Sequence, residues 1–359
     1  MKTLTVIARR FGTQEREELE RQIKADACPR LLHFHDGLSS GPDASYAAAR
    51  SLGREGLARH LPEGLGIAVG AYLAGRRYDA IVCWEDRAAL LLALLMKVTG
   101  ARTPHVAIFN WLSSPRKAMV LRLVQSHIDR VLVYNSRQQE LAISAVGLAP
   151  NKVTYIDYFV DQQFWRPMAS VENTVYSLGN EMRDYATLIE AMRGLDIPCR
   201  ISARPGRAKG KRLTTLGTIL AGGRLPDNVS VGTPRSYVEG RDLYARARFV
   251  VIPLLPTDVD HGGTAIMESM AMGKAVITSR VAGQVDFVVE GETGLYVPPQ
   301  DPAALREAIQ FLWTHPETAA RMGRAGRTRV EERYTLEQFV ARVKRILEDV
   351  VRVPVPLAS

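Results

Sequence analysis

One stretch, residues 249–278, constrains the fold more than any other part of this 359-residue chain. Residues 249–252 (FVVI) form an apolar run of the kind found in parallel strands that are covered on both faces. Two prolines end this run, a glycine pair follows, and residues 274–278 begin a second apolar run. The pattern predicts strand, loop, short helix and strand, with Thr264 as the helix N-cap and Gly273 as its C′ residue.

The start of this short helix is a candidate anion-binding site, because its first amides have no partner within the helix and the helix dipole favours negative charge there. Gly262 and Gly263 allow a ligand to approach the backbone closely. Asp260 precedes the turn, and Glu268 lies inside the helix. Carboxylates repel phosphate, so one interpretation is that they bind the hydroxyls of a ribose or a hexose. The alternative is that Glu268 complements the helix dipole and Asp260 is a solvated loop residue.

The sequence around these residues resembles the donor-site signature of the GT-B glycosyltransferases of family GT4. The similarity runs through residues 268–277 (ESMAMGKAVI) and continues over residues 282–301 (AGQVDFVVEGETGLYVPPQD). Asp260 stands where that family carries the first of two glutamates, in the position that contacts the hexose. The shorter side chain keeps a carboxylate at this position and leaves the identity of the sugar open.

Two further stretches carry the same resemblance. Residues 129–167 follow the family's strand-Ser-helix pattern and its Gly-Val-Asp-x-x-x-Phe-x-Pro motif, with Phe159 in place of the glycine. Residues 175–191 resemble the stretch in which an arginine and a lysine hold the donor diphosphate. Gly179 is kept there, Asn180 replaces the first cation, and Arg183 supplies the second. The first 128 residues share only the rhythm of strands and helices.

This resemblance implies an α/β fold of two Rossmann-like, doubly wound domains that face each other across a cleft, the GT-B fold. We expect an N-terminal acceptor-side domain over residues 1–165, with a C-terminal helix at residues 336–359 packed back on it. Residues 166–335 would then form the C-terminal domain that binds the nucleotide sugar. The chain is long enough for two domains of this kind.

The resemblance also implies a donor site in the second domain. Its expected residues are Gly179, Asn180, Arg183, Arg204, Thr233, Asp260, Gly262, Gly263, Thr264 and Glu268. The expected catalytic residues are Asp260, Glu268, Arg183 and Asn110. Backbone amides and Arg183 would stabilise the charge on the leaving diphosphate, so we expect neither a metal ion nor a cofactor.

The acceptor side is expected in the first domain, beyond the carboxyl ends of its strands. The candidate residues are Gly12, Trp84, Glu85, Asp86 and Trp111. Glu85 and Asp86 are either an acid/base pair or acids at a helix N-terminus. Asn110 stands where many relatives carry a histidine, and it retains the ability to donate and accept hydrogen bonds.

The net charge of +9 suits an anionic ligand, an anionic membrane surface or nucleic acid. The helix expected near residues 113–124 is basic on one side, and it either rests on anionic lipid or is an ordinary amphipathic helix. The basic loop at residues 204–212 has no interleaved aromatic residues, so we expect no nucleic-acid partner. Three scattered cysteines, no signal peptide and no spanning apolar run favour a cytoplasmic protein. If the basic helix rests on lipid, the protein is also peripheral at the inner face of the membrane.

The resemblance therefore implies a retaining glycosyltransferase. It would move a hexose from a nucleotide-diphosphate sugar, UDP-linked in most such enzymes, to an unidentified acceptor such as a lipid, a glycan or a small molecule. Two alternatives stay open: a sugar-nucleotide epimerase or phosphorylase on the same fold, and a non-catalytic basic peripheral adaptor. The sequence gives no indication of the oligomeric state.

Overall fold

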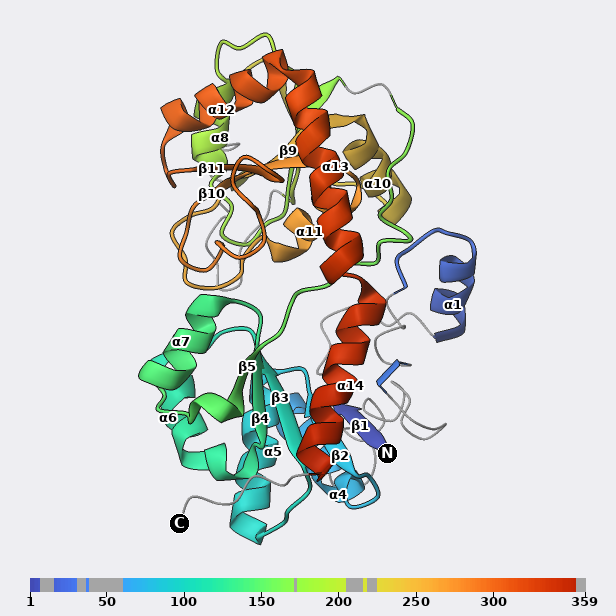
Figure 1. Ribbon diagram of the computed structural model, residues 1–359, viewed down its shortest axis with the longest axis vertical. Helices are drawn as coiled ribbons and strands as arrows, with labels where there is room; N and C mark the ends of the chain where they lie inside the picture. The colour runs from blue at the N-terminus through green and yellow to red at the C-terminus, as the bar shows by residue number, and fades with distance from the viewer. Residues whose placement is uncertain are drawn as a thin grey trace. The chain divides into compact units, whose positions relative to one another are not determined.

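The structure is a computed structural model that describes residues 1–6, 16–30, 37–38, 61–170, 173–204, 216–217 and 225–352 (Figure 1). It divides into two compact units. Unit 1 comprises residues 1–15, 31–157 and 337–359, and unit 2 comprises residues 16–30 and 158–336. Each unit is an α/β structure built on a parallel sheet.

The sheet of unit 1 has its described strands side by side in chain order. They are β1 (Thr3–Val6), β2 (Ala80–Cys83), β3 (His105–Phe109), β4 (Arg130–Val133) and β5 (Val153–Tyr155), and every pairing is parallel. The connecting elements are α4 (Glu63–Gly75), α5 (Asp86–Thr99), α6 (Pro115–Val124), α7 (Ser136–Ser144), η3 (Gln125–His127) and η4 (Pro150–Lys152). Parallel strands that progress in one direction with right-handed crossovers place their connecting helices on the same face.

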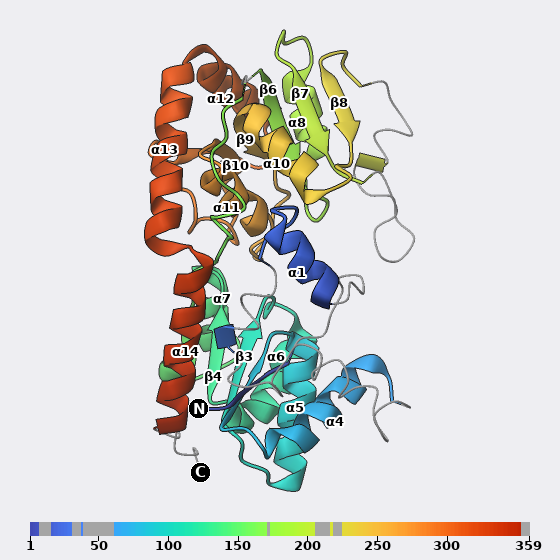
Figure 2. The same cartoon turned by 90° about the vertical axis from the view of Figure 1, so that its right-hand side faces the viewer.

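Helix α14 (Leu336–Arg352) covers the opposite face of this sheet (Figure 2). The rings of Trp84 and Tyr134, which follow β2 and β4, lie 5.4 and 6.4 Å from the ring of Phe339 in α14. Arg342 of the same helix forms an ion pair with Asp157 at 3.2 Å. Aromatic packing and this ion pair therefore hold the C-terminal helix against unit 1.

The sheet of unit 2 has the strand order β11-β10-β9-β6-β7-β8. These strands are β6 (Thr174–Leu178), β7 (Cys199–Ser202), β8 (Val229–Gly232), β9 (Ala247–Ile252), β10 (Ala275–Ser279) and β11 (Gly294–Val297). The helices are α1 (Arg16–Lys24), α8 (Tyr185–Met192), α10 (Tyr237–Arg246), α11 (Gly263–Ala271), α12 (Pro302–Thr314) and α13 (Pro316–Arg333). From β6 the next strands, β7 and β8, are added on one side, and β9 to β11 are added on the other, so the switch point of this doubly wound sheet lies between β6 and β9.

Strand β9 is buried on both faces, as its apolar sequence predicts. Phe249 and Val251 belong to one apolar cluster, which also contains residues of α8 and α12. Val250 and Ile252 belong to a second cluster, which contains residues of α11 and α13. This alternation follows from the two-residue period of a strand. It explains why a central strand of a covered sheet has no polar face.

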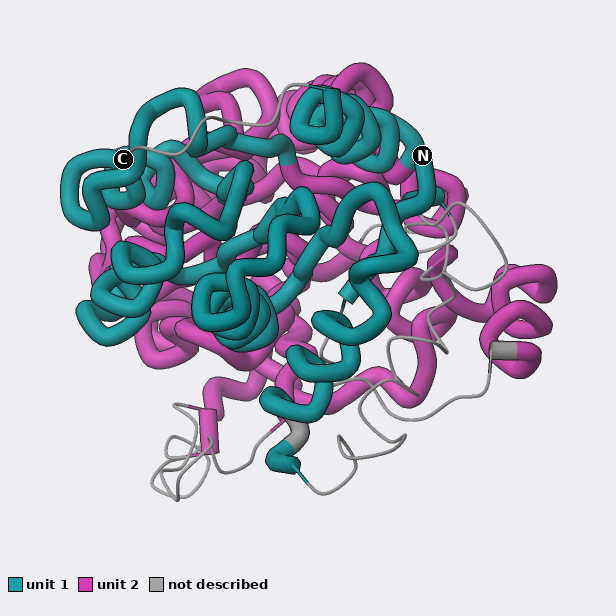
Figure 3. The backbone as a smooth tube through the Cα atoms, turned by 90° about the horizontal axis from the view of Figure 1, so that it is seen from below, with its two compact units in different colours: residues 1–15, 31–157, 337–359 teal, residues 16–30, 158–336 magenta. Residues whose placement is uncertain are grey.

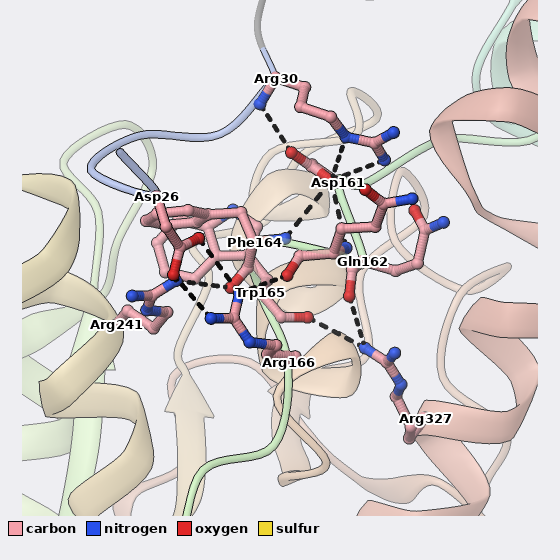
Figure 4. Close-up of polar contacts among 10 residues, drawn as sticks. Asp26, Arg30, Asp161, Gln162, Phe164, Trp165, Arg166, Arg241 and Arg327 are labelled. Carbon is pink, nitrogen blue, oxygen red and sulfur yellow. Dashed lines mark hydrogen bonds and ion pairs between the residues drawn. The ribbon is translucent and has the colours of Figure 1, made fainter. Parts of the chain in front are cut away.

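Residues 16–30 belong to unit 2, whereas the division expected from the sequence assigned them to the first domain and placed the boundary after residue 165 (Figure 3). Ion pairs hold this N-terminal segment in place (Figure 4). Asp26 contacts Arg166 at 2.6 Å and Arg241 at 2.9 Å, and Arg30 contacts Asp161 at 2.8 Å. These partners are far apart in the sequence, so no local pattern indicates their pairing.

Candidate functional site

The candidate donor site lies where the loops that follow β6 and β9 meet at the switch point of unit 2. Arg183 and Leu254 form an isolated antiparallel bridge. The amide of Leu255 donates to the carbonyl of Met182 at 2.9 Å, and the amide of Asp184 donates to the carbonyl of Pro253 at 3.0 Å. Ligands of open α/β sheets bind at this type of position. The backbone therefore fixes Arg183 beside the loop that leads into α11.

Helix α11 begins at Gly263, and its N-cap is Gly262 rather than the expected Thr264. Gly262 adopts the left-handed conformation with a φ of 93°, which a glycine reaches without steric cost. The turn therefore ends before Thr264 and makes that residue part of the first helical turn. At the other end, Gly273 has a φ of 70° and follows the C-cap residue Met272, so its predicted C′ role is confirmed.

The first turn of α11 presents backbone amides that the described protein groups leave unpaired. The amide of Gly263 donates to the carbonyl of Asp260 at 3.1 Å, and the amide of Ile266 donates to the carbonyl of Gly262 at 2.9 Å. Between them, the amides of Thr264 and Ala265 have no acceptor in the described part of the chain. Two adjacent amides at the positive end of a helix form an anion-binding element.

Arg183 is buried at the end of β6 and is held by backbone carbonyls. Its Nε donates to the carbonyl of Leu178 at 2.8 Å, and its Nη1 donates to the carbonyl of Glu181 at 2.9 Å. Burial lowers the pKa of its guanidinium. Gly179 has a φ of 105°, and a Cβ at this position would lie 2.5 Å from Nη2 of Arg183. Only glycine therefore fits against this guanidinium.

The two predicted carboxyl groups are half-buried near α11, and both are shifted toward the neutral form. Burial raises the pKa of Asp260 to about 6. Burial also raises the pKa of Glu268 to about 7, although the hydroxyl of Tyr244 donates to its Oε2 at 2.9 Å and acts in the opposite direction. Ligand hydroxyls that donate to these oxygens would favour the charged form. Both side chains are thus suited to binding neutral, polar groups.

Tyr158 is a site residue that was not predicted from the sequence. Its hydroxyl lies 2.8 Å from Oγ1 of Thr264. Its ring contacts the rings of Phe159 and Phe287, with 5.6 Å between centroids in each case. Burial raises the pKa of this phenol, and the charge of Asp260 contributes to the same effect. Tyr158 directly precedes Phe159, which replaces the glycine of the family motif. That replacement is the sequence feature that could have drawn attention to Tyr158.

The remaining predicted donor residues follow β6, β7 and β8 along the same edge of the sheet. Oδ1 of Asn180 accepts a hydrogen bond from the amide of Arg204 at 2.8 Å. The hydroxyl of Thr233 donates to the carbonyl of Ala203 at 3.2 Å. The structure thus joins the ends of β6 and β7 through Asn180, and those of β7 and β8 through Thr233. The Arg204 and Thr233 side chains are exposed at this edge.

The predicted acceptor-side residues of unit 1 follow β2 and β3, except Gly12, which lies outside the described residues. Trp84 packs against Phe339, and Glu85 is the N-cap residue of α5. Asp86 is buried in the first turn of α5, where it forms an ion pair with Lys117 and accepts a hydrogen bond from the amide of Asn110 at 3.3 Å. The side chains of Asn110 and Trp111 are exposed.

The described residues contain no group of three or more His, Cys, Asp or Glu side chains arranged to hold a metal ion. No described helix has both the length and the apolar character that are needed to cross a membrane.

Residues 176–329 match the family model described as "Glycosyl transferases group 1". This segment of unit 2 is similar to the glycosyl transferases group 1 family. All the predicted donor-site residues lie within the matched segment, from Gly179 to Glu268. The similarity to this family that the sequence motifs indicated is therefore confirmed.

Curated relatives of this chain include two bacterial enzymes. D-rhamnosyltransferase WbpZ of Pseudomonas aeruginosa is 39% identical over 74 residues, which cover 20% of this chain and 19% of that protein. D-inositol 3-phosphate glycosyltransferase 1 of Catenulispora acidiphila is 26% identical over 335 residues, which cover 84% of this chain and 73% of that protein. Several other relatives are matched over less than half of their own length.

Solved structures confirm the GT-B fold class. Sucrose-phosphate synthase from Thermosynechococcus elongatus has a TM-score of 0.68 at 20% identity, with 88% of this chain and 82% of that chain covered. Anabaena Alr3699/HepE, in complex with UDP-glucose, has a TM-score of 0.68 at 16% identity, with 98% of this chain and all of that chain covered (100%). At such identities the likeness concerns the fold alone, which consists of two parallel-sheet α/β units.

Proposed function

We propose that this chain is a retaining glycosyltransferase that transfers a hexose from a UDP-sugar to an acceptor hydroxyl. The observation that carries the proposal is the pair of adjacent amides of Thr264 and Ala265 at the start of α11, beside the loop that holds Arg183. The surrounding segment is similar to the glycosyl transferases group 1 family. The crystallised HepE complex with UDP-glucose supports the choice of a UDP-linked donor.

In this proposal the diphosphate of the donor binds to the α11 amides and to the guanidinium of Arg183. Transfer breaks the bond between the sugar's anomeric carbon and the diphosphate oxygen, so negative charge builds up on the leaving oxygen. Fixed donors aimed at such charge contribute roughly 3 kcal/mol each to transition-state stabilisation. Arg183 is already held by two carbonyls, so little reorganisation is needed when the charge develops. No metal ion or cofactor takes part in this scheme.

The two carboxyl groups would bind hydroxyls, Glu268 those of the ribose and Asp260 those of the hexose. A raised pKa suits this role, because each carboxyl gains hydrogen bonds from the ligand that it lacks without it. Asn180, Arg204 and Thr233 would surround the nucleoside. Asn110 would face the acceptor, which we propose to be a lipid, a glycan or a small molecule. The proposal includes peripheral contact of the chain with an anionic membrane.

The test is calorimetric titration with UDP and UDP-sugars, followed by analysis of the products. Arg183→Ala should weaken nucleotide binding by more than about tenfold, since a charged hydrogen bond is worth roughly 1.5–3 kcal/mol. Arg193→Ala is the matched control, because Arg193 is an exposed arginine of the same unit whose Nε donates to Glu190 at 3.0 Å. Unchanged affinity in a folded Arg183→Ala variant would remove Arg183 from the site.

Product analysis separates the alternatives. A sugar-nucleotide epimerase would convert the UDP-sugar without any acceptor, and a phosphorylase would require inorganic phosphate. A basic adaptor would show no nucleotide affinity at all. Retention would appear as a product whose anomeric configuration equals that of the donor, measured by nuclear magnetic resonance.

A further inference from the structure

Helix α6 in unit 1 carries an exposed face that combines apolar and basic side chains. Met119 is 64% exposed and Leu123 is 55% exposed, and Arg116 and Arg122 are exposed as well. Successive residues of an α-helix are about 100° apart, so these four side chains occupy an arc of roughly 120°. They therefore form one continuous strip along the helix.

The opposite side of α6 fixes the helix to the core. Leu121 and Val124 are completely buried and belong to the apolar cluster of unit 1. The fold therefore has its anchoring contacts without Met119 and Leu123. Two large exposed apolar side chains on one strip of a helix mark an interaction surface more strongly than scattered single ones.

Residues next to α6 add an aromatic ring and positive charge. The ring of Trp111, 49% exposed, lies just before α6, with the ammonium of Lys117 5.2 Å from its centroid. Lys97 of α5 donates to the carbonyl of Leu123. We call the set Lys97, Trp111, Arg116, Met119, Arg122 and Leu123 the α6 face.

The positive charge of the α6 face is not balanced by ion pairs among the described residues. Asp86 pairs with Lys117, which lies about 160° around the helix from the strip. Arg122 donates to the carbonyls of Ala145 and Val146, and Lys97 also bonds to a carbonyl, so these two contacts leave the cationic charge uncompensated. Helix α6 itself contains three basic residues and no acidic residue. The α6 face is therefore both apolar and cationic.

We propose that the α6 face docks on the surface of an anionic lipid bilayer. Apolar side chains with basic neighbours along one helix are the combination that binds interfacially, and tryptophan favours the level of the headgroups. Each basic side chain near an anionic bilayer increases affinity by roughly fivefold. The net charge of +9 adds a longer-range attraction to the same surface. The inference deepens the membrane contact of the proposed function by assigning the surface that makes it.

The test is co-sedimentation of the full chain with vesicles of phosphatidylcholine and phosphatidylglycerol, compared with vesicles of phosphatidylcholine alone. Binding should require the anionic lipid and should be lost at about 1 M salt, where the Debye length falls to about 3 Å. Arg116→Glu and the double variant Met119→Ser with Leu123→Ser should each lower the affinity by more than about tenfold.

The matched controls lie in the same unit, outside the α6 face. Leu73 of α4 is 63% exposed, and Arg77 is exposed just after that helix, so Leu73→Ser and Arg77→Glu should bind vesicles as the wild type does. Equal binding by the α6 variants and the wild type, or equal losses in the control variants, would overturn the proposal. Equal binding to both kinds of vesicle would overturn it as well.

Nucleotide titration of each variant keeps this test separate from the proposed reaction. The α6 variants should bind UDP as the wild type does, because the donor residues belong to unit 2. A protein that binds anionic vesicles through the α6 face and ignores nucleotides would refute the proposed transferase and leave the docking surface standing. The reverse result would refute only the docking surface.

Discussion

Replacing Glu268 with glutamine should make the protein more stable at neutral and higher pH, because it removes a charge that is costly to bury. Burial raises the pKa of Glu268 from its ordinary value of 4.5 to about 7. Between these values the folded state binds more protons than the unfolded state, so the free energy of unfolding falls as the pH rises. The difference of about 2.5 pH units, at about 1.36 kcal/mol each, gives an upper bound of about 3 kcal/mol.

The variant retains the main contact of this side chain. The hydroxyl of Tyr244, 2.9 Å from Oε2 of Glu268, can donate equally to the amide oxygen of glutamine. The change therefore removes the titration and leaves the packing intact. Glu190→Gln is the control, because the Glu190 side chain is 59% exposed and its partner Arg193 stays charged at both pH values of the assay, so the same substitution there removes a charge without changing the titration.

The assay is thermal unfolding of the wild type and both variants at about pH 5 and at about pH 8. For a unit of this size, 1 kcal/mol corresponds to roughly 2–4 °C in Tm. The Tm of Glu268→Gln minus the Tm of the wild type should be larger at about pH 8 than at about pH 5, by up to roughly 6–12 °C. The Tm difference between Glu190→Gln and the wild type should stay constant. Parallel Tm profiles for Glu268→Gln and the wild type would refute the raised pKa and the burial on which it rests.

Three further predictions concern single contacts. Gly179→Ala should weaken UDP binding by more than about tenfold in calorimetry, since the new Cβ would displace the guanidinium of Arg183; unchanged affinity would contradict this. Asp161→Asn should lower the free energy of unfolding by about 3 kcal/mol or more in urea titrations, because Arg30 and the amides of Gln163 and Phe164 lose their charged acceptor. A loss below about 1 kcal/mol would argue against a stabilising role of this carboxylate. Tyr158→Phe should keep the Tm within a few degrees and lower kcat/KM for the donor by roughly tenfold, because the hydrogen bond to Thr264 is lost while the ring is kept. Wild-type kinetics would show that this hydroxyl has no part in the reaction.

The elements around α11 were predictable from the sequence because they depend on local patterns. The apolar run of β9, the glycine pair and the glycine after α11 each report a requirement of the backbone within a few residues. The N-cap was placed wrongly because a threonine is a common cap, whereas the left-handed φ of Gly262 ends the turn earlier. The sequence contains no sign of which of two adjacent glycines adopts that conformation.

Contacts between distant segments were not predictable in this way. The docking of residues 16–30 on unit 2 depends on Asp26 meeting Arg166 and Arg241, which lie 140 and 215 residues away. The contact of Tyr158 with Thr264 likewise joins residues 106 positions apart. Nothing in a single sequence marks such pairs, since charged and aromatic residues are common at positions without a partner.

The most direct test of the central claim is a crystal structure of the protein with a bound UDP-sugar. The account predicts diphosphate oxygens about 3 Å from the amide nitrogens of Thr264 and Ala265 and from the guanidinium of Arg183, with the sugar at Asp260 and the ribose at Glu268. A complex in which the nucleotide lies elsewhere, or in which side chains fill the start of α11, would contradict it.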